Sequence, residues 1–472
     1  MAACSNATPV VHASFKTTSL TVPESLGKVV IAVELSAPAV NAVRVGLKFS
    51  GTADLDRDFR APAFVEFAPN TTEALVELET LADHETECGE VAFIELANSD
   101  GGQRKFALRL ADQDQPARRL RVGPAPGEYI TPSAASLEAR SGDIVEIAEG
   151  NYPGDVAVWR ANDIVICGEG RGASIDANGK AAEGKGIWVI KGDRVRVENI
   201  QFKGAKVSDG NGAGIRAEGL DLTVRHCLFE RNENGILAGA SPTSTITVEY
   251  SMFNHNGAGD GYTHNIYIGN IKRLNVRFST LREAVAGHNV KSRAAETRLE
   301  YNRIMDGKTG NASYQIDLPD GGNAVVLGNV IQQGPEAENW TMISYGAEGL
   351  KYQNNALNLI NNTVVNDRHS GLFIESPKSV PCVLINNLFA GKGETHCENG
   401  KQAGNVTSDS GFFDRKGYDY HLTTGAKAIN QGIVPDLIGA YAKPLYEFDA
   451  DGAIRHRISV DAIDAGAYEF MN

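Results

Sequence analysis

The sequence predicts an all-β protein in which an antiparallel β-sandwich precedes a right-handed parallel β-helix. Three observations lead to this fold class. Short segments of similar sequence recur every 23 to 33 residues over most of the chain, the first hundred or so residues alternate between apolar and polar side chains, and 50 glycines supply frequent tight turns. A repeat of this length that contains short strands and no helical pattern is typical of a β-solenoid.

Residues 1–112 are expected to form the β-sandwich. Short runs of alternating apolar and polar residues, joined by turns rich in Gly, Asp and Asn, are typical of two packed antiparallel sheets. The alternation is clear over 29–35, 43–47, 74–78 and 92–96. Residues 113–130 contain three prolines and are expected to be a linker. The parallel β-helix is then expected over 131–472, with a segment near its end that caps the last coil.

The repeat aligns one polar or small residue per coil at a bend. The aligned positions are Asn199, Cys227, Ser251, Ser279, Asn302, Asn329, Asn362 and Asn387. An inward asparagine at a bend donates to and accepts from the same position of the next coil, which satisfies its buried amide. The five asparagines are therefore expected to have a structural role and no catalytic one.

Charge and cysteine content limit the classes of protein. A formal net charge of −14 argues against a nucleic-acid-binding surface, because phosphate binding needs a concentrated basic face. No run of 18 apolar residues is present, so no transmembrane segment is expected. Most of the six cysteines are expected to be buried thiols, but Cys382 and Cys397 are placed to pair across one loop. The chain is expected to be a monomer.

Two resemblances concern the N-terminal part. The start, Met1 to Cys4, is similar to the end of a bacterial lipoprotein signal, which implies a lipid anchor on Cys4. The order of features at 22–24, 51–53, 58–59, 67–70, 83–87 and 94–96 resembles a Calx-beta domain. Calx-beta domains often bind calcium through acidic residues at one end of the sandwich, where Asp83, Glu85 and Glu87 stand here. The usual adjacent aspartates are missing, so a spacer role is expected, and Ca²⁺ stays a candidate cofactor.

A cluster of polar residues at 260–320 marks the candidate site. Ile266, Val290 and Ile316 are expected to point inward, so their neighbours point outward and form columns across coils about 4.8 Å apart. One column is Asn265, Asn289 and Gln315, and the next is Tyr267, Lys291, Asp317 and Ser344, with Arg293 one step further along and His264 and His288 where two of the strands begin.

The segments 290–292, 299–303 and 322–329 are similar to the catalytic coils of the chondroitinase B and alginate lyase family of β-helix polysaccharide lyases. The resemblance implies a secreted or cell-surface enzyme that cleaves a uronate-containing polysaccharide by β-elimination, with Lys291 as the base that removes the C5 proton. The family's arginine does not carry over, because Asp317 stands in the corresponding stretch; Arg293 or Arg303 is the candidate replacement.

This interpretation assigns roles to twelve residues. We expect catalytic roles for Lys291, His288, Arg293, Asp317, His264 and Tyr267, and substrate-binding roles for Asn265, Asn289, Gln315, Arg303, Tyr314 and Asp320. An Asp317 carboxylate beside Lys291 stabilises the ammonium form. Lys291 would then bind the substrate's carboxylate, while Tyr267 or a histidine transfers protons.

Three alternatives remain open at this point. A glycoside hydrolase would use Asp317 or Asp320 with a second carboxylate from Asp260 or Glu348. A uronate C5-epimerase would exchange the C5 proton without cleavage. A non-catalytic surface protein would bind glycans through the same columns, with the first domain as an adhesive module. The sequence shows no set of metal ligands at the site.

Overall fold

A computed structural model describes residues 11–82, 88–97, 102–111, 118–434, 443–459 and 461–470. The chain divides into two compact units, Met1–Pro116 with Ala453–His456, and Ala117–Gly452 with Arg457–Asn472. The expected lipid anchor at Cys4 and the acidic residues Asp83, Glu85 and Glu87 lie outside the described residues.

The described part of the first unit contains two sheets. One holds β1 (Ala13–Phe15), β3 (Lys28–Leu35), β7 (Glu73–Thr80) and β5 (Phe59–Arg60), paired antiparallel in this order. The other holds β2 (Ser19–Pro23), β9 (Lys105–Ala111), β8 (Glu90–Leu96) and β4 (Val43–Gly51), with β6 (Phe64–Phe67) and β46 (Ile454–His456) also paired to β4. A short 3₁₀ turn, η1 (Glu24–Leu26), follows β2. Alternate residues of β3 and β7 are buried, which is the sandwich pattern that the alternation predicts.

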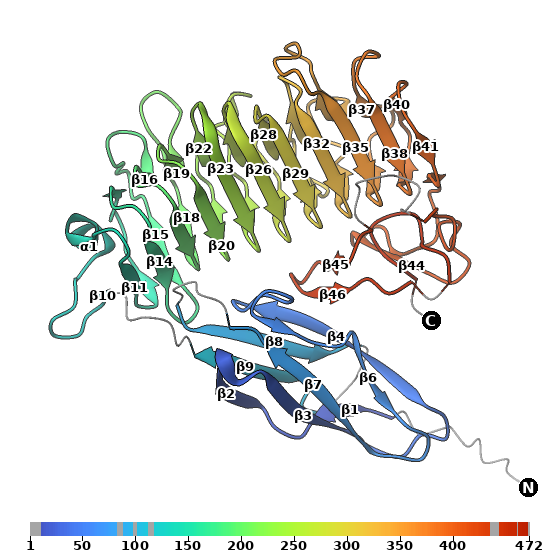
Figure 1. Cartoon of the computed structure of the whole chain (residues 1–472). Helices are drawn as coiled ribbons and strands as arrows, with labels where there is room; N and C mark the ends of the chain where they lie inside the picture. Colours follow the sequence, from blue (N-terminus) through green and yellow to red (C-terminus); the bar gives the residue numbers. More distant parts are fainter. Residues whose placement is uncertain are drawn as a thin grey trace, which may run out of the picture. The chain divides into compact units, whose positions relative to one another are not determined.

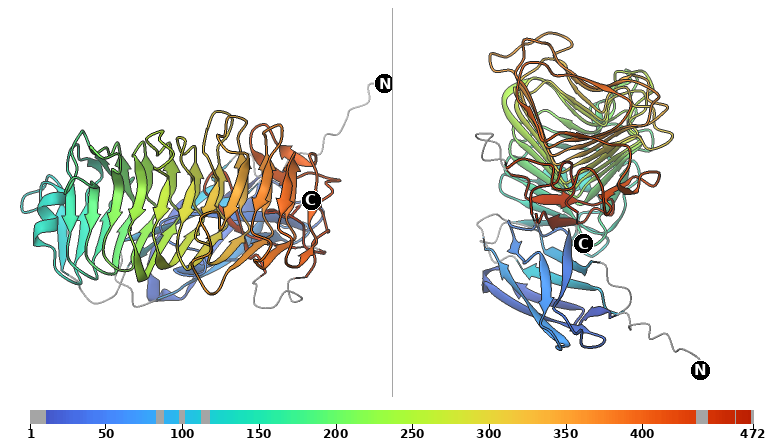
Figure 2. Two further views of the ribbon diagram at one scale, coloured as in Figure 1. Left: turned by 90° about the horizontal axis from the view of Figure 1, so that it is seen from above. Right: turned by 90° about the vertical axis from the view of Figure 1, so that its right-hand side faces the viewer.

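The second unit is a solenoid of three parallel sheets, whose strands follow one another in sequence order along the stack (Figures 1 and 2). In the described residues the sheets hold 12, 11 and 10 strands. The first sheet contains β10 (Arg119–Val122), β11 (Ile144–Ile147), β14 (Val165–Gly168), β17 (Val195–Glu198), β20 (Leu222–Arg225), β23 (Ser241–Glu249), β26 (Ile271–Arg277), β29 (Glu296–Glu300), β32 (Asn323–Leu327), β35 (Ala356–Ile360), β38 (Cys382–Ile385) and β41 (Gln402–Ala403).

The second sheet contains β12 (Gly150–Asn151), β15 (Ala173–Asp176), β18 (Ile200–Lys203), β21 (Leu228–Glu230), β24 (Met252–Asn254), β27 (Thr280–Arg282), β30 (Arg303–Met305), β33 (Val330–Gln333), β36 (Thr363–Asn366), β39 (Leu388–Gly391) and β42 (Val406–Thr407). The third contains β13 (Ala157–Trp159), β16 (Gly186–Ile190), β19 (Ala213–Ala217), β22 (Asn234–Ala238), β25 (Ile266–Ile268), β28 (Val290–Ser292), β31 (Ile316–Leu318), β34 (Thr341–Tyr345), β37 (Leu372–Glu375) and β40 (Glu394–His396). The predicted fold class, a parallel β-helix preceded by a β-sandwich, is confirmed.

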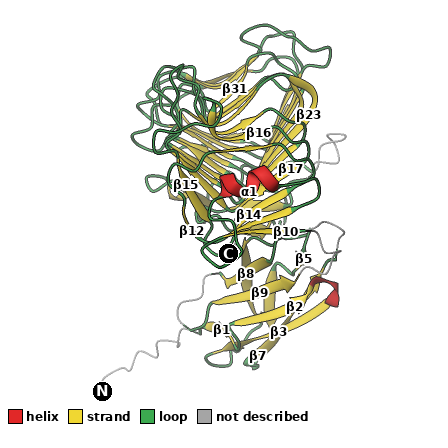
Figure 3. Ribbon diagram, turned by 90° about the vertical axis from the view of Figure 1, so that its left-hand side faces the viewer, coloured by secondary structure: helices red, strands yellow, loops and turns green. Residues whose placement is uncertain are grey.

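The linker prediction for 113–130 does not hold at 119–122. Leu120 and Val122 are buried and β10 pairs in parallel with β11, so the first coil begins inside the expected linker. Beyond it, α1 (Pro132–Glu138) starts at Thr131, whose hydroxyl accepts a hydrogen bond from the Ala134 N–H. Figure 3 looks along the solenoid and shows α1 lying across its first coil.

The core of the solenoid consists of stacked aliphatic and aromatic side chains. Ile236, Ile266, Val290, Ile316 and Ile343 occupy the same register position in five consecutive strands of the third sheet and are fully buried. Branched side chains suit such positions because they pack against identical neighbours above and below on the pleated surface. The strands are thereby held in a register that fixes which residues face outward.

The asparagine ladder at the bend between the first two sheets forms as predicted from Asn302 onward. Asn302 Nδ2 donates to Asn329 Oδ1 at 3.0 Å, Asn329 to Asn362 at 2.9 Å, and Asn362 to Asn387 at 3.0 Å. Asn199 is not part of it. Its φ of +54° places it at the preceding position of the bend, where it donates to the Gly168 carbonyl instead.

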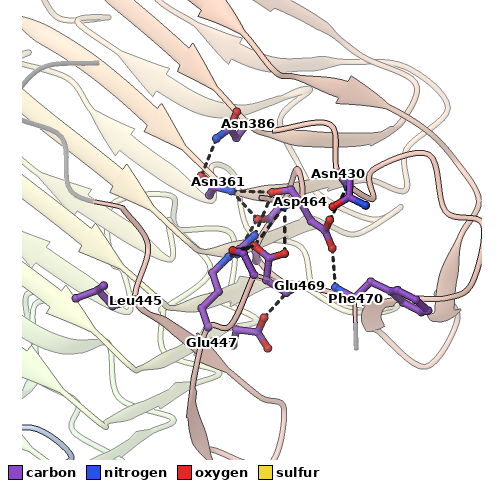
Figure 4. A network of polar contacts seen from close by, with 12 residues as sticks. Asn361, Asn386, Asn430, Leu445, Glu447, Asp464, Glu469 and Phe470 are labelled. Carbon is purple, nitrogen blue, oxygen red and sulfur yellow. Dashed lines mark hydrogen bonds and ion pairs between the residues drawn. The ribbon is translucent and has the colours of Figure 1, made fainter. Parts of the chain in front are cut away.

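The C-terminal segment packs on the solenoid through a buried polar network (Figure 4). Arg457 donates to Glu469 Oε1 at 2.9 Å and to the carbonyls of Gly466 and Asp464. The Asp464 carbonyl also accepts a hydrogen bond from Asn361 Nδ2 of the bend after β35. This segment includes β43 (Phe412–Asp414), β44 (Asp419–Leu422) and β45 (Tyr446–Phe448).

The cysteines differ in part from the expectation of buried thiols. Cys382 and Cys397 form a disulfide across one loop, as the sequence allows, and Cys227 is a buried free thiol. Cys88 and Cys167 are disulfide-bonded, so the thiol prediction is wrong for them. Disulfides are typical of proteins from oxidising compartments. Among the described residues, no helix has the length and apolar character needed to cross a membrane.

Candidate functional site

A polar column lies on the outer face of the third sheet. Tyr267 of β25 pairs with Lys291 of β28, Lys291 with Asp317 of β31, and Asp317 with Ser344 of β34. The residues on both sides of each of these positions within the strand are buried in the solenoid, so these four side chains point away from it. The structure therefore has the outward-facing column that the alignment of successive coils predicts.

Lys291, Asp317 and His288 form a compact polar cluster. Lys291 Nζ lies 3.6 Å from Asp317 Oδ2, and His288 Nε2 lies 3.4 Å from the same oxygen. Lys291 Nζ is also 5.5 Å from the centre of the Tyr267 ring. The exposed fraction of the side chain is 13% for Lys291 and 5% for Asp317. The ammonium thus reaches solvent, whereas its carboxylate partner lies beneath it.

Arg293 holds a second cation beside Lys291. Its Nη1 donates to Asp320 Oδ1 at 2.7 Å and its Nη2 lies 2.8 Å from Glu348 Oε2. Burial opposes the charge of Arg293, but hydrogen bonds to Tyr267 and Glu348 outweigh it and hold the pKa of Arg293 above its ordinary value. Glu348 Oε1 lies 4.0 Å from Lys291 Nζ, so one carboxylate bridges both cations.

Asp317 is a carboxyl group that titrates near neutral pH. Burial raises its pKa to about 6, although the Lys291 ammonium and a hydrogen bond from Ser344 favour the ionised form. The group is therefore ionised above about pH 6 and protonated below it. Carboxyl groups with such a pKa are suited to proton transfer or to controlling the charge of a neighbour.

The two histidines are neutral and buried. Burial, followed by the charge of Lys291, lowers the pKa of His288 to about 3. Burial and the neighbouring His288 also lower the pKa of His264. The rings stack at 4.4 Å between centres, and His264 Nδ1 accepts a hydrogen bond from the His288 backbone N–H. His288 Nδ1 accepts weakly from the Tyr314 N–H at 3.4 Å, which leaves its Nε2 proton facing Asp317. Both uncharged histidines therefore lie on the buried side of the Lys291 and Asp317 pair.

The predicted first column, Asn265, Asn289 and Gln315, does not face outward. All three side chains are fully buried and form an inner amide ladder. Asn265 donates to Asn289 at 2.6 Å, Asn289 to Gln315 at 2.7 Å, and Gln315 to Asp306 at 2.7 Å. The expected substrate-binding role is therefore wrong for these residues. They stand at the bend before each strand, where the chain turns and the alternation of a straight strand does not apply.

The substrate-binding role expected for Arg303 is also wrong. It belongs to β30 of the second sheet, and it is buried, with its guanidinium donating to the Tyr468 hydroxyl at 2.9 Å and to the Tyr418 carbonyl at 2.8 Å. Arg303 therefore anchors the C-terminal segment and is not a substitute for the missing arginine. Asp320 is buried and bound to Arg293, so it positions that cation and is not a free contact for a sugar.

Some residues near the cluster were not among the expected site residues. The Tyr352 hydroxyl donates to the Arg293 carbonyl, and Trp340, which is 65% exposed, directly precedes β34. Tyr314, for which a substrate-binding role was expected, is half-buried, with its ring 4.9 Å from that of His288. Asp260, considered as a second carboxylate, instead caps its own loop by accepting from the Tyr262 and Thr263 N–H groups. Glu348 is the carboxylate that reaches the cluster.

Among the described residues, no group of three or more His, Cys, Asp or Glu side chains is arranged to hold a metal ion. The site's carboxylates are instead paired with Lys291 and Arg293.

Comparison of the sequence with protein-family profiles and with curated proteins finds no match. Among solved structures, the chain is similar to pectate lyase Pel9A, with 14% identity and a TM-score of 0.57 over 75% of this chain and 97% of that chain. An alginate lyase from Paenibacillus sp. aligns at 15% identity with a TM-score of 0.39, over 61% of this chain and 99% of the lyase. The Calx CBD1 domain aligns at 23% identity with a TM-score of 0.20, covering 22% and 98%. The likeness to the pectate lyase establishes a shared parallel β-helix fold.

Proposed function

We propose that this chain cleaves a uronate-containing polysaccharide by β-elimination at the Lys291 and Arg293 cluster. The observation that carries the proposal is that two cations from one coil are already bridged by a single carboxylate, that of Glu348. A uronate carboxylate has the same charge and the same two oxygens, so it fits between the same groups. The pectate lyase with this fold acts, by its name, on such a polymer.

Neutralising the uronate carboxylate is the first requirement of the reaction. The negative charge that develops at C5 when its proton is removed delocalises into that carboxylate, and two fixed cations stabilise it there. Asp320 and Tyr352 hold Arg293 in place through hydrogen bonds, and Asp317 holds Lys291 in place through an ion pair of 3.6 Å. These residues fix the two charges in place before substrate arrives.

Proton transfer is assigned to Tyr267, the alternative to a Lys291 base. Its ring lies beneath the Lys291 ammonium, and its hydroxyl forms a hydrogen bond with Arg293. A phenolate that forms there during the reaction faces two positive charges. The Tyr267 hydroxyl gives its proton to the departing O4 oxygen and takes the C5 proton in return. The electron pair of the C5–H bond forms the C4–C5 double bond as the C4–O bond breaks, and the tyrosine ends as the neutral phenol. His288 orients Asp317 and is a positioning residue.

Exposed aromatic side chains support binding of a sugar polymer. Tyr262 and Trp340 lie in the segments that lead into β25 and β34, three coils apart, and are 78% and 65% exposed. Flat aromatic faces stack on the apolar faces of pyranose rings, and both side chains are exposed enough for such contact. The polymer would then extend along the stack, across the coils that carry Lys291 and Asp317.

Product analysis of the wild-type chain tests this proposal. The protein is incubated with polygalacturonate, alginate and glucuronate-containing glycans, while ultraviolet absorbance reports unsaturated ends and a reducing-end assay reports total cleavage. We expect both signals to rise together on at least one polymer. Reducing ends without unsaturation, deuterium incorporation at C5 without cleavage, or binding alone would each replace elimination with hydrolysis, epimerisation or a purely adhesive role.

A glycoside hydrolase is the second candidate, favoured by one observation. Asp317 and Glu348 lie in opposed environments: burial raises the pKa of Asp317 to about 6, whereas Glu348 is solvent-exposed and paired with Arg293. A neutral acid and an ionised carboxylate are the pair that glycoside hydrolysis requires. This candidate predicts loss of cleavage in Glu348→Gln, whereas elimination does not require that carboxylate.

A further inference from the structure

We propose that Glu348 is an internal competitor that occupies the subsite for the substrate's carboxylate and is displaced when a uronate binds. This inference rests on the proposed function and names the subsite at which the polymer's charge is recognised. It also assigns Glu348 a role in setting affinity and specificity, which differs from that of a catalytic carboxylate.

The contacts of Glu348 resemble those of a bound ligand. Its two oxygens lie 2.8 and 2.9 Å from Arg293 Nη2, and Oε1 lies 4.0 Å from Lys291 Nζ. The residue reaches back 55 positions in sequence to make them. Both oxygens contact one guanidinium nitrogen, because Nη1 is bound to Asp320, so the contact is weaker than the fork in which two nitrogens each donate to one oxygen.

Exposure separates Glu348 from the other carboxylates at the site. Among the described residues, Lys291 and Arg293 have acidic partners in Asp317, Asp320 and Glu348. The side chains of Asp317 and Asp320 are 5% and 11% exposed, whereas that of Glu348 is 52% exposed. A ligand from solution can replace only a partner that solvent reaches, and an exposed ion pair is weak. Glu348 is the partner that meets both conditions.

The backbone around Glu348 is fixed, so a change of side-chain rotamer is sufficient for release. The Gly346 N–H donates to Leu318 O at 2.8 Å, the Glu348 N–H to Pro319 O at 3.0 Å, and the Lys351 N–H to Asp320 O at 2.9 Å. These bonds tie the turn between β34 and β35 to the turn after β31. Glu348 therefore remains beside the subsite after its carboxylate leaves, and it returns when the product departs.

The consequence is selectivity against ligands that do not carry a carboxylate. A neutral sugar gains too little at this subsite to displace Glu348, whereas a uronate exchanges one carboxylate for another and keeps both cations paired. Removing the competing charge should then strengthen uronate binding by roughly twofold to fivefold, as expected for loss of an exposed ion pair. Binding of neutral sugars should not change.

Calorimetric titration of the full-length chain tests the inference. D-galacturonate and D-glucuronate are the probes, and galactose and glucose are their neutral counterparts. The variants are Glu348→Gln and, as a matched control, Glu336→Gln, which removes one exposed charge from the preceding loop without a contact to either cation. We expect a lower Kd for the uronates in Glu348→Gln alone, and loss of uronate binding when Arg293→Gln is added.

Several outcomes would overturn the inference. They are an unchanged or higher uronate Kd in Glu348→Gln, an equal gain in Glu336→Gln, or no uronate binding to either protein at millimolar concentration. Turnover separates this inference from the proposed function. Tighter uronate binding in Glu348→Gln without unsaturated product from any variant would retain the subsite and reject elimination. Unsaturated product from wild type with turnover abolished in Glu348→Gln would retain elimination and reject the competitor.

Discussion

Replacing Asp317 by asparagine should stabilise the protein at neutral pH. Asp317 is buried beneath Lys291, and its pKa of about 6 lies above the ordinary value of 3.8. The native state therefore binds a proton more tightly than the unfolded chain does. A raised carboxyl pKa contributes stability that is fully present below about pH 4 and is lost as the pH rises through 6.

The size of the expected stabilisation follows from the pKa shift of Asp317. About two pKa units correspond to about 3 kcal/mol of stability lost by the wild type between pH 4 and pH 7, with the Lys291 contact already included. Asparagine cannot ionise, so Asp317→Asn should match the wild type near pH 4 and exceed it by about 3 kcal/mol at pH 7. Elimination activity should fall in the same variant, because Lys291 loses the buried carboxylate that holds its ammonium group in place.

Urea unfolding of both proteins from pH 4 to pH 8 measures this difference. Asp306, whose pKa burial raises to about 7, titrates in both proteins and cancels in the comparison. Asp209→Asn, at an exposed loop position, is the control for removing one charge. A stability difference between the two proteins that is independent of pH, or one in which the advantage of the variant shrinks as the pH rises, would show that the Asp317 carboxyl is not penalised by burial.

Two further predictions concern the scaffold. Asn329→Ala removes a ladder residue that donates to Asn362 and accepts from Asn302, and should lower the free energy of unfolding in urea by about 2 to 4 kcal/mol. The control Asn323→Ala, at an exposed strand position, should lower it by less than about 1 kcal/mol, and equal losses would contradict the ladder's role. Arg303→Met should lower stability by breaking its bonds to Tyr468 and Tyr418 but leave the KM for a uronate polymer unchanged, and a raised KM without loss of stability would restore Arg303 as a substrate contact.

The sequence was sufficient to predict the solenoid and one face of it. A repeat of 23 to 33 residues fixes the coil, and the alternation around Ile266, Val290 and Ile316 fixes which neighbours point outward, which is why Tyr267, Lys291 and Asp317 lie where expected. Register in a parallel sheet carries such a pattern from one coil to the next, because every strand repeats the same inward positions.

The repeat and the strand alternation do not predict the bends or the long-range contacts. The side chain of Asn289 turns inward because it stands at a corner, and no alternation rule describes a corner. Arg303 forms hydrogen bonds with Tyr418 and Tyr468, which are 115 and 165 positions away in the sequence. Glu348 lies in a turn and contacts Arg293, which is 55 positions away. Repeat patterns relate each coil to the next, but such contacts depend on loops and on a C-terminal segment that follow no period.

The rate at which Lys291→Ala releases unsaturated ends from a uronate polymer tests the central claim most directly. Lys272→Ala, at an exposed position of the first sheet, is its matched control. We predict that Lys291→Ala loses roughly a hundredfold or more of the wild-type rate, as expected when a charge that stabilises the transition state is removed, while Lys272→Ala keeps it. A rate in Lys291→Ala equal to that of the wild type would contradict the assignment of this site.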